Sequence, residues 1–599
     1  MNQPKDFYRS RLDAATGEVA GLTARFAKIG LARLTMFLLA VALGVVVVAQ
    51  RGGVALYGIG ATGVSFVALL IWHERVARAK DRTVRSAQYY ARGAARLEDR
   101  WLEGGDDGAR FLDPNHLYAA DLEIFGRGSL YHLVASTRTE TGAATLASWL
   151  AGPAPVNVIA QRQAAIRELA GLPDLRHDLA VVPAGSGAAL DSATLRRWFL
   201  DPAIGFPGWA SSVTLVLGAL NVGLTGVALA GWMPGWSVVP GYLVGWLVVL
   251  RLQSRAQQVL ARVDRPAREL QVVASLLSRV DREQFTGPLL QSLADRWRAT
   301  GASPVAEIGY LSRLVDVVDA RRNQLFMPIS GLLLLGTQLA IRIDRWRTRV
   351  GPTAVDWLAA VGELEALVSL ATHAFEHPDD CYPQLTPAGS GLVAGDLGHV
   401  LLPTLRTVRN DLSLGGAVRL VMVSGSNMSG KSTLLKATGI NLVLAFAGAP
   451  VRARTFATEP FAVGASLVLR DSLLEGRSRF FAEILRLRDI VAMANEGRPA
   501  LFLLDELLSG TNSHDRAIGA RGVLMGLLDR GAVGVVTTHD LALTALADEL
   551  GARGANWHLE DTLVGGQLRF DYRLKPGVVR RSNALELMKA VGLDVPIER

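Results

Sequence analysis

The chain has 599 residues, with 63 lysines and arginines against 55 aspartates and glutamates, and half of its residues are apolar. This length allows several domains, and the single cysteine, Cys381, excludes both a disulfide framework and a cysteine-based metal cluster. The formal charge of +8 indicates an anionic partner, either a nucleic acid or a lipid surface.

Two apolar runs predict a transmembrane helical hairpin within an N-terminal segment, residues 1–85. The runs cover residues 34–49 and 54–72, and only Gln50-Arg51-Gly52-Gly53 separates them. Each run is close to the length that crosses a bilayer as a helix. A cleaved signal peptide is the alternative, but a second apolar run follows at once and no small-residue cleavage site comes between them.

The next segment, residues 86–200, has apolar residues at helical spacing and is predicted to be helical. A second transmembrane hairpin is predicted within residues 201–252, with runs at about 206–232 and 238–250. Its second run is near the lower limit for crossing a membrane. Four tryptophans could anchor this hairpin at the membrane interfaces: Trp209, Trp232, Trp236 and Trp246.

Basic residues flank both hairpins, and their distribution predicts the orientation. The flanking residues are Arg25, Lys28, Arg33, Arg75, Arg78, Lys80, Arg82 and Arg85 for the first hairpin, and Arg251, Arg255, Arg262, Arg265 and Arg268 for the second. Because such residues stay on the cytoplasmic side, both ends of each hairpin are expected there. The sequence therefore predicts a multi-pass protein of the inner (cytoplasmic) membrane with its C-terminal domain in the cytoplasm, and the membrane accounts for much of the positive charge.

Further helices are predicted over residues 253–385. A third apolar stretch, residues 325–341, favours a buried core helix over another span, because one extra span would place the C-terminal domain outside. Apolar residues at helical spacing predict a helix over residues 354–376. Proline and glycine cluster at residues 383–398, which predicts the boundary to an α/β domain at residues 386–599.

A glycine-rich loop follows the apolar run Leu420–Val423 and predicts a phosphate-binding site between a buried strand and a helix. Glycines allow backbone N–H groups to approach phosphate oxygens, while Lys431 would reach the β- and γ-phosphates and Ser432 would bind Mg²⁺. The loop comprises Gly425, Ser426, Asn427, Met428, Ser429, Gly430, Lys431, Ser432 and Thr433.

Two later apolar runs end in residues suited to nucleotide hydrolysis. Residues 500–504 are apolar throughout and lead into Asp505 and Glu506, as expected for a buried parallel strand with a ligand site at its carboxyl end. Asp505 is predicted to hold Mg²⁺ and Glu506 to activate the attacking water. The run 533–538 ends before His539, which could sense the γ-phosphate. An acidic N-cap and a structural histidine are the alternative interpretations.

Together these motifs resemble the ATPase domain of the MutS family, a branch of the ABC ATPases. The loop GSNMSGKST is similar to the family's GPNMGGKST, and the residues after Glu506 are similar to its DEIGRGTSTYDG turn. The resemblance implies that Asn410 lies beside the adenine. It also implies that Ser478 contacts the γ-phosphate bound by a second subunit, so that a homodimer forms composite ATP sites.

The resemblance extends upstream, where residues 112–180 are similar to the start of the family's helical core and lever, and residues 354–376 to the helix that closes the lever. The family's mismatch-finding members begin with a domain whose Phe-x-Glu wedge stacks on the mispaired base. Here apolar segments replace that domain. The expected architecture is thus multidomain α and α/β, with two transmembrane hairpins, a helical MutS-like core and lever, and a P-loop ABC-type ATPase domain.

The expected activity is hydrolysis of ATP with Mg²⁺. One hypothesis is a membrane-anchored MutS-like ATPase acting on a nucleic acid, including mismatched or branched DNA, or on a protein partner. The alternative is an ABC-type membrane machine for transport or envelope remodelling. Spans without internal charges make a poor substrate pathway, which favours the first hypothesis. The sequence does not identify the physiological substrate.

Overall fold

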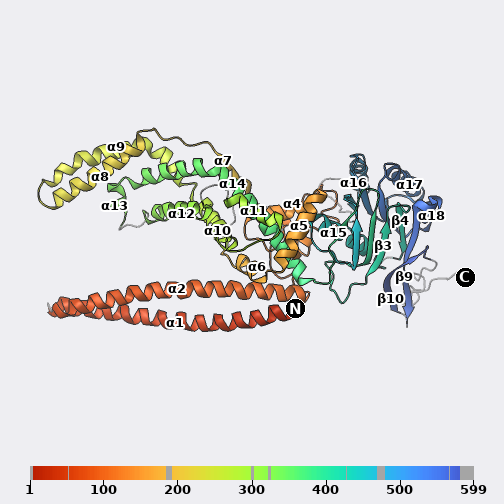
Figure 1. The fold of residues 1–599 in the computed structure, drawn as a ribbon, viewed down its shortest axis with the longest axis horizontal. Coiled ribbons are helices and arrows are strands. Elements are labelled where there is room, and N and C mark those ends of the chain that lie inside the picture. The colour runs from red at the N-terminus through yellow and green to blue at the C-terminus, as the bar shows by residue number, and fades with distance from the viewer. Residues whose placement is uncertain are drawn as a thin grey trace. The chain divides into compact units, whose positions relative to one another are not determined.

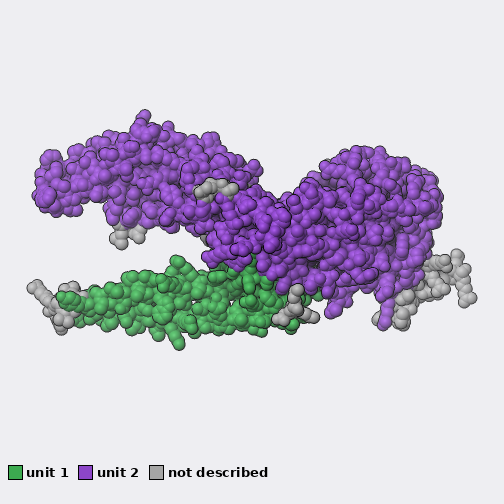
Figure 2. All heavy atoms as spheres, in the orientation of Figure 1, with its two compact units in different colours: residues 1–103, 173–184 green, residues 104–172, 185–599 purple. Residues whose placement is uncertain are grey.

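The computed structural model describes residues 4–50, 53–183, 192–298, 303–321, 326–426, 428–467, 479–564 and 567–579 (Figure 1). The chain divides into two compact units (Figure 2). Unit 1 contains residues 1–103 and 173–184, and unit 2 contains residues 104–172 and 185–599.

Unit 1 is a hairpin of two long helices, α1 (Pro4–Gln50) and α2 (Gly53–Leu97), with the short helix α6 (Pro173–Ala180) packed against α2. Near the chain's N-terminus the two long helices are held by aromatic side chains, and Tyr90 stacks on His177 of α6 with ring centroids 4.9 Å apart. The predicted apolar runs lie at the opposite end, where α1 finishes and α2 begins. Leu34 and Phe37 of α1 are exposed there.

The helical part of unit 2 is organised around α14 (Leu335–Glu376), which includes the helix predicted at residues 354–376. Most of one face of α14 is buried because several helices pack along its length. These neighbours include α3 (Leu130–Val134), α4 (Glu140–Leu150), α5 (Val156–Ala170), α7 (Ser192–Leu200), α10 (Asp264–Val280), α11 (Pro288–Arg298) and α12 (Pro304–Ala320).

The joint between α4 and α14 is a buried carboxylate. Glu365 of α14 accepts hydrogen bonds from the backbone N–H groups of Arg138 and Thr139, and from the Thr139 hydroxyl, at the N-terminus of α4. Burial raises the pKa of Glu365 to about 7, although these donors favour the charged form. The contact fixes α14 to the start of α4.

A second hairpin, α8 (Ala210–Leu229) and α9 (Val239–Leu260), extends from the helical part of unit 2 (Figure 1). The described residues include three helices long and apolar enough to cross a membrane, within Pro4–Val47, Ala210–Leu229 and Gly235–Leu260. The last two coincide with the second predicted hairpin.

The apolar stretch predicted at residues 325–341 is divided between two helices. The short helix α13 (Met327–Leu332) ends before Leu334, whose φ of 52° lies in the left-handed region, and α14 begins at Leu335. Leu339 and Ile341 are buried, whereas Met327 is exposed.

The C-terminal part of unit 2 is an α/β domain with two sheets. The larger sheet has the order β10-β9-β4-β8-β7-β6, and its neighbours are parallel except for β10 and β9. Its strands are β4 (Leu420–Gly425), β6 (Ala462–Ser466), β7 (Ala500–Asp505), β8 (Val533–Thr538), β9 (Gly554–Val564) and β10 (Gln567–Pro576). The smaller sheet has the order β1-β5-β2-β3, with β1 (Gln384–Leu385), β2 (Leu392–Leu397), β3 (Asn410–Leu414) and β5 (Thr455–Thr458).

Helices cover both faces of the larger sheet. Helix α15 (Lys431–Ala447) lies on one face, and α16 (Arg479–Ala494), α17 (Ser513–Asp529) and α18 (Leu541–Glu549) lie on the other. On the second face, Met422, Phe502 and Leu504 form a buried core with these three helices. The predicted combination of helical regions with an α/β domain is therefore confirmed.

Candidate nucleotide-binding site

The glycine-rich loop connects the central strand β4 to α15, as its sequence predicts. Lys431 is the first residue of α15, and its buried ammonium group donates hydrogen bonds to the carbonyls of Gly425, at 2.9 Å, and Ser426, at 2.8 Å. Burial lowers the pKa of Lys431, while Glu506 and Asp505 oppose that shift. The lysine is thus held across its own loop, where a phosphate group could replace the two carbonyls.

Asp505 ends β7 and is oriented by two hydroxyl groups. Ser432 donates to its Oδ2 at 2.5 Å, and Thr537 donates to its Oδ1. Thr537 reaches Asp505 because β7 and β8 are parallel neighbours in which these two residues are paired. A carboxylate beside a serine hydroxyl supplies the hard oxygen ligands that Mg²⁺ prefers, so this pair fits the expected metal.

Glu506 follows directly and turns away from the strand with a φ of 51°. Its backbone N–H donates to the Thr537 carbonyl at 3.1 Å, and its carboxylate lies 3.3 Å from Nδ1 of His539. Both side chains are partly exposed. A carboxylate beside a partly exposed imidazole can bind and deprotonate a water molecule.

A cavity of about 970 Å³ brings these groups together, and it is large enough for a nucleotide. Its lining includes Met428, Gly430, Lys431, Ser432, Thr433, Asp505 and Glu506 on one side, and His399, Asn410, Phe570 and Tyr572 on the other. The rings of Phe570 and Tyr572 are stacked, with centroids 5.7 Å apart. Such an aromatic and polar wall suits the base of a nucleotide, and burial lowers the pKa of His399 to about 4, which keeps it neutral.

Asn410, predicted to lie beside the adenine, lines this cavity but also fixes β10. Its Nδ2 donates to the Tyr572 carbonyl at 3.0 Å, and its Oδ1 accepts from the N–H of Leu574 at 2.7 Å. Both bonds lie where the pairing of β9 with β10 shifts its register between Phe570 and Leu574. Asn410 therefore positions Tyr572 against the cavity.

Other predicted site residues lie around this centre. The hydroxyls of Ser426 and Ser429 are buried and have no hydrogen-bond partner among the described residues, which fits a loop that closes on a polar ligand. His539 reaches the site through Glu506. Asn427 and Ser478 lie outside the described residues. The sequence interpretation missed Thr537, His399, Phe570 and Tyr572. Of these only Thr537 carried a signal, because it lies next to the last residue of a predicted strand.

The helical part of unit 2 contacts the helices that flank the site. Lys436 of α15 forms an ion pair with Glu123 at 2.7 Å. Arg486 of α16 donates a hydrogen bond to the His116 carbonyl at 2.6 Å. The Asp121 carboxylate accepts one from the N–H of Leu467 at 2.7 Å. Residues 116–123 thus hold both the helix that carries Lys431 and the helix on the opposite face.

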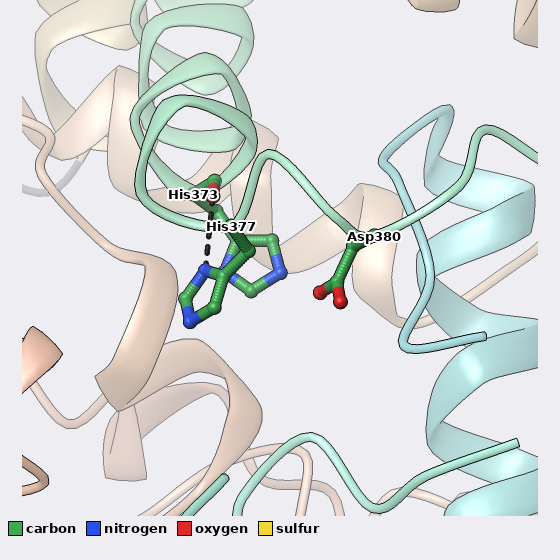
Figure 3. A group of neighbouring side chains, drawn as sticks. All are labelled: His373, His377 and Asp380. Atoms are coloured by element: carbon green, nitrogen blue, oxygen red, sulfur yellow. Dashed lines mark hydrogen bonds between the residues drawn. The ribbon is translucent and has the colours of Figure 1, made fainter. Parts of the chain in front are cut away.

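A second contact between the helical part of unit 2 and the α/β domain lies at the end of α14, where His373, His377 and Asp380 approach one another (Figure 3). Their ligand atoms lie within 4.8 Å of one another, a composition that could hold a metal ion. However, Asp380 already forms a buried ion pair with Arg452 at 3.0 Å, and His377 Nδ1 is bonded to the His373 carbonyl at 3.0 Å. These bonds explain the cluster as a joint, because Arg452 in turn donates its N–H to Asn441 of α15.

The fold and the site define an α/β nucleotide-binding domain fixed to a helical region. Residues 421–597 match the family described as MutS domain V. The C-terminal domain therefore matches the ATPase domain of the MutS family, as its motifs predicted.

Comparison with individual curated proteins agrees with this family match. The chain is 34% identical over 203 residues to endonuclease MutS2 of Thermus thermophilus, covering 33% of this chain and 25% of the relative. It is 32% identical over 240 residues to DNA mismatch repair protein MutS of Natronomonas pharaonis, covering 39% and 27%. DNA mismatch repair protein MutS 2 of Haloarcula marismortui is 32% identical over 269 residues, covering 40% and 27%. The chain thus spans about a quarter of the length of these curated relatives.

Proposed function

We propose that the protein is a membrane-anchored, MutS-type ATPase that couples ATP binding and hydrolysis to a conformational change acting on a nucleic acid or a protein partner. The observation that carries this proposal is the cavity in which Lys431, Ser432, Asp505 and Glu506 meet within a MutS-family ATPase domain. In it Lys431 binds the β- and γ-phosphates, and Ser432 and Asp505 hold Mg²⁺. Glu506, assisted by His539, activates the attacking water.

Membrane anchoring is supported by apolar helices that remain exposed to their surroundings. The helices α1, α8 and α9 have the length and composition of membrane spans, and basic residues flank both hairpins. With the hairpin ends in the cytoplasm, the ATPase domain faces the cellular ATP. The inner (cytoplasmic) membrane is the proposed location.

The active form is proposed to be a homodimer. By resemblance to the family, Ser478 of one chain completes the ATP site built on Lys431 of the other. Inactive Lys431→Ala chains mixed with inactive Ser478→Arg chains test this arrangement, because a heterodimer then contains one intact composite site. Partial recovery of hydrolysis supports sharing between chains. The control is a heterodimer of one wild-type chain and one Lys431→Ala chain. If this control is active but the purified heterodimer of Lys431→Ala and Ser478→Arg chains is not, sharing of the site between chains is ruled out.

The partner is proposed to be DNA in the first instance, because two of the relatives described above are named for DNA mismatch repair. The test is the ATPase rate of the full chain in phospholipid nanodiscs with duplex, mismatched or branched DNA. Stimulation by DNA, absent in Lys431→Ala, supports the proposal. A rate that responds only to lipid composition favours the alternative, an ABC-type machine for transport or envelope remodelling.

A further inference from the structure

We propose that the α13–α14 elbow, residues 327–341, is a third membrane-embedded element that contacts phospholipid acyl chains in the cytoplasmic leaflet beside α8 and α9. This inference rests on the proposed membrane anchoring of the α8–α9 hairpin. The elbow is a separate segment that lies outside the α8–α9 hairpin.

The elbow packs against the middle of the hairpin through small residues. A side chain on Gly218 of α8 would come within 2.8 Å of the Leu333 carbonyl oxygen, so only glycine allows this approach. On α9, a side chain on Gly245 would meet the amide of Asn221 at 3.3 Å and the side chain of Leu334 at 3.4 Å. Close contacts over small residues are typical of helices that associate in membranes.

Polar side chains satisfy the backbone where the two helices break. Gln338 donates to the Leu333 carbonyl at 2.9 Å and to the Thr214 carbonyl at 3.1 Å. Asn221 of α8 is 2% exposed, and its Nδ2 lies 3.5 Å from the Leu332 carbonyl oxygen. In water these carbonyls would need no such partners, whereas irregular backbone at membrane depth must be satisfied by the protein.

Charged residues mark the level at which the membrane would begin. Arg345 of α14 lies 3.3 Å from Ser211 at the start of α8, and Arg251 follows Gly245 along α9. The guanidinium of Arg321, at the end of α12, lies beside Gly336, just after the break at Leu334. From Thr214, which Gln338 contacts, to Gly218 and Asn221 the helix rises roughly 6–10 Å. That is the depth to which interfacial helices bury their apolar face.

The elbow itself carries no charge, and its outer side is apolar. Residues 327–341 read MPISGLLLLGTQLAI, with Met327 62% and Ile329 47% exposed. Because α13 contacts α8 of a hairpin whose exposed apolar side chains are assigned to the bilayer, acyl chains are the proposed occupant of this surface.

The test places a polarity-sensitive fluorophore on single cysteines in a Cys381→Ser background. The full chain, with ATPase activity verified, is reconstituted into vesicles of phosphatidylethanolamine and phosphatidylglycerol. The fluorophore is attached in three separate variants, each at an exposed position: Ile329→Cys in the elbow, Leu243→Cys on α9 and Arg313→Cys on α12. Quenching by spin labels on the acyl chains is compared with quenching by aqueous iodide.

We expect acyl-chain quenching at Ile329 comparable with that at Leu243, and iodide quenching at Arg313. If Leu243 is quenched by the acyl chains but Ile329 only by iodide, the elbow proposal is overturned while the anchoring proposal stands. If neither quencher reaches Ile329, protein covers it, and the elbow proposal is overturned as well. Iodide quenching at Leu243 would overturn the anchoring proposal itself.

Discussion

In the nucleotide site polar groups hold one another in place, whereas along the α8–α9 hairpin the chain leaves large apolar side chains exposed. Asp505 is held by Ser432 and Thr537, and Lys431 by two carbonyls of its own loop. By contrast, Leu243 and Val244 of α9 face outward with no core over them. In the first region the described polar groups bond to one another, whereas in the second the described part of the chain leaves apolar side chains uncovered.

This difference separates the part of the molecule proposed to set its activity from the part proposed to set its location. Substitutions in the nucleotide site should change catalysis without changing membrane insertion. Substitutions on the outer face of the hairpin should do the reverse. The predictions below test this separation, beginning with the largest expected effect.

Glu506→Gln should lower ATP turnover by roughly 10²–10⁴-fold, because the amide cannot accept the proton of the attacking water. Binding of MgATP should be retained, and Lys431→Ala should instead weaken binding because the phosphates lose their charge partner. Steady-state hydrolysis and equilibrium nucleotide binding distinguish the two variants. Glu496→Gln, at an exposed position in the same domain, is the matched control. Equal turnover by Glu506→Gln and wild type would remove Glu506 from the mechanism.

Val244→Arg should prevent insertion of the α8–α9 hairpin, since an arginine near the middle of a span costs about 2.5–3.5 kcal/mol. Leu405→Arg, in the ATPase domain, is the control, because Leu405 is 100% exposed and Val244 48% exposed. Insertion is measured by labelling Trp236→Cys, at the hairpin tip, with an impermeant maleimide from outside intact cells, in a Cys381→Ser background. Labelling should be lost only with Val244→Arg. Labelling that survives in that variant would contradict the membrane assignment of α9.

Thr537→Val should raise the Mg²⁺ concentration needed for half-maximal activity by roughly tenfold, because one hydrogen bond to a charged group is worth about 1.5–3 kcal/mol. The carboxylate of Asp505 keeps its bond to Ser432 but loses its second donor. Thr438→Val removes a buried hydroxyl that bonds only within α15, to the Leu434 carbonyl, and serves as the control. An unchanged Mg²⁺ dependence in Thr537→Val would show that Ser432 alone positions Asp505.

The sequence predicted the centre of the site because the loop at residues 425–433 and the pair Asp505-Glu506 each follow an apolar strand. Parallel strands bring their carboxyl ends to one edge, so their proximity could be inferred. Thr537 was not recognised as a partner of Asp505, because that contact depends on β8 lying between β4 and β7. The sequence of a single strand does not determine the order of the strands in the sheet.

The helical regions were predictable for a different reason and to a different extent. Apolar periodicity predicted the helix at residues 354–376, but not its start at Leu335 or the break at Leu334. At that break the Leu332 carbonyl lies beside Asn221, which is distant in the chain, and Gln338 donates to the Leu333 carbonyl and also to the distant Thr214 carbonyl. Local pattern alone favours a single buried helix over residues 325–341, because it contains no information about these partners.

Asn410→Ala should have the smallest effect, a weakening of ATP binding by about fivefold, equivalent to about 1 kcal/mol. The reason is indirect: alanine removes the two hydrogen bonds that fix Tyr572 and Leu574 at the register shift of β10. The Tyr572 ring then loses its fixed position beside Phe570, and the cavity wall becomes less ordered before the nucleotide arrives.

Titration with a fluorescent ATP analogue measures this affinity, and Tyr572→Ala separates the two roles of Asn410. If Asn410 acts only by positioning the ring, Asn410→Ala adds nothing in a Tyr572→Ala background. If it contacts the base directly, as the family resemblance implies, the two effects add. The double variant therefore decides whether Asn410 contacts the base directly or only positions the ring of Tyr572.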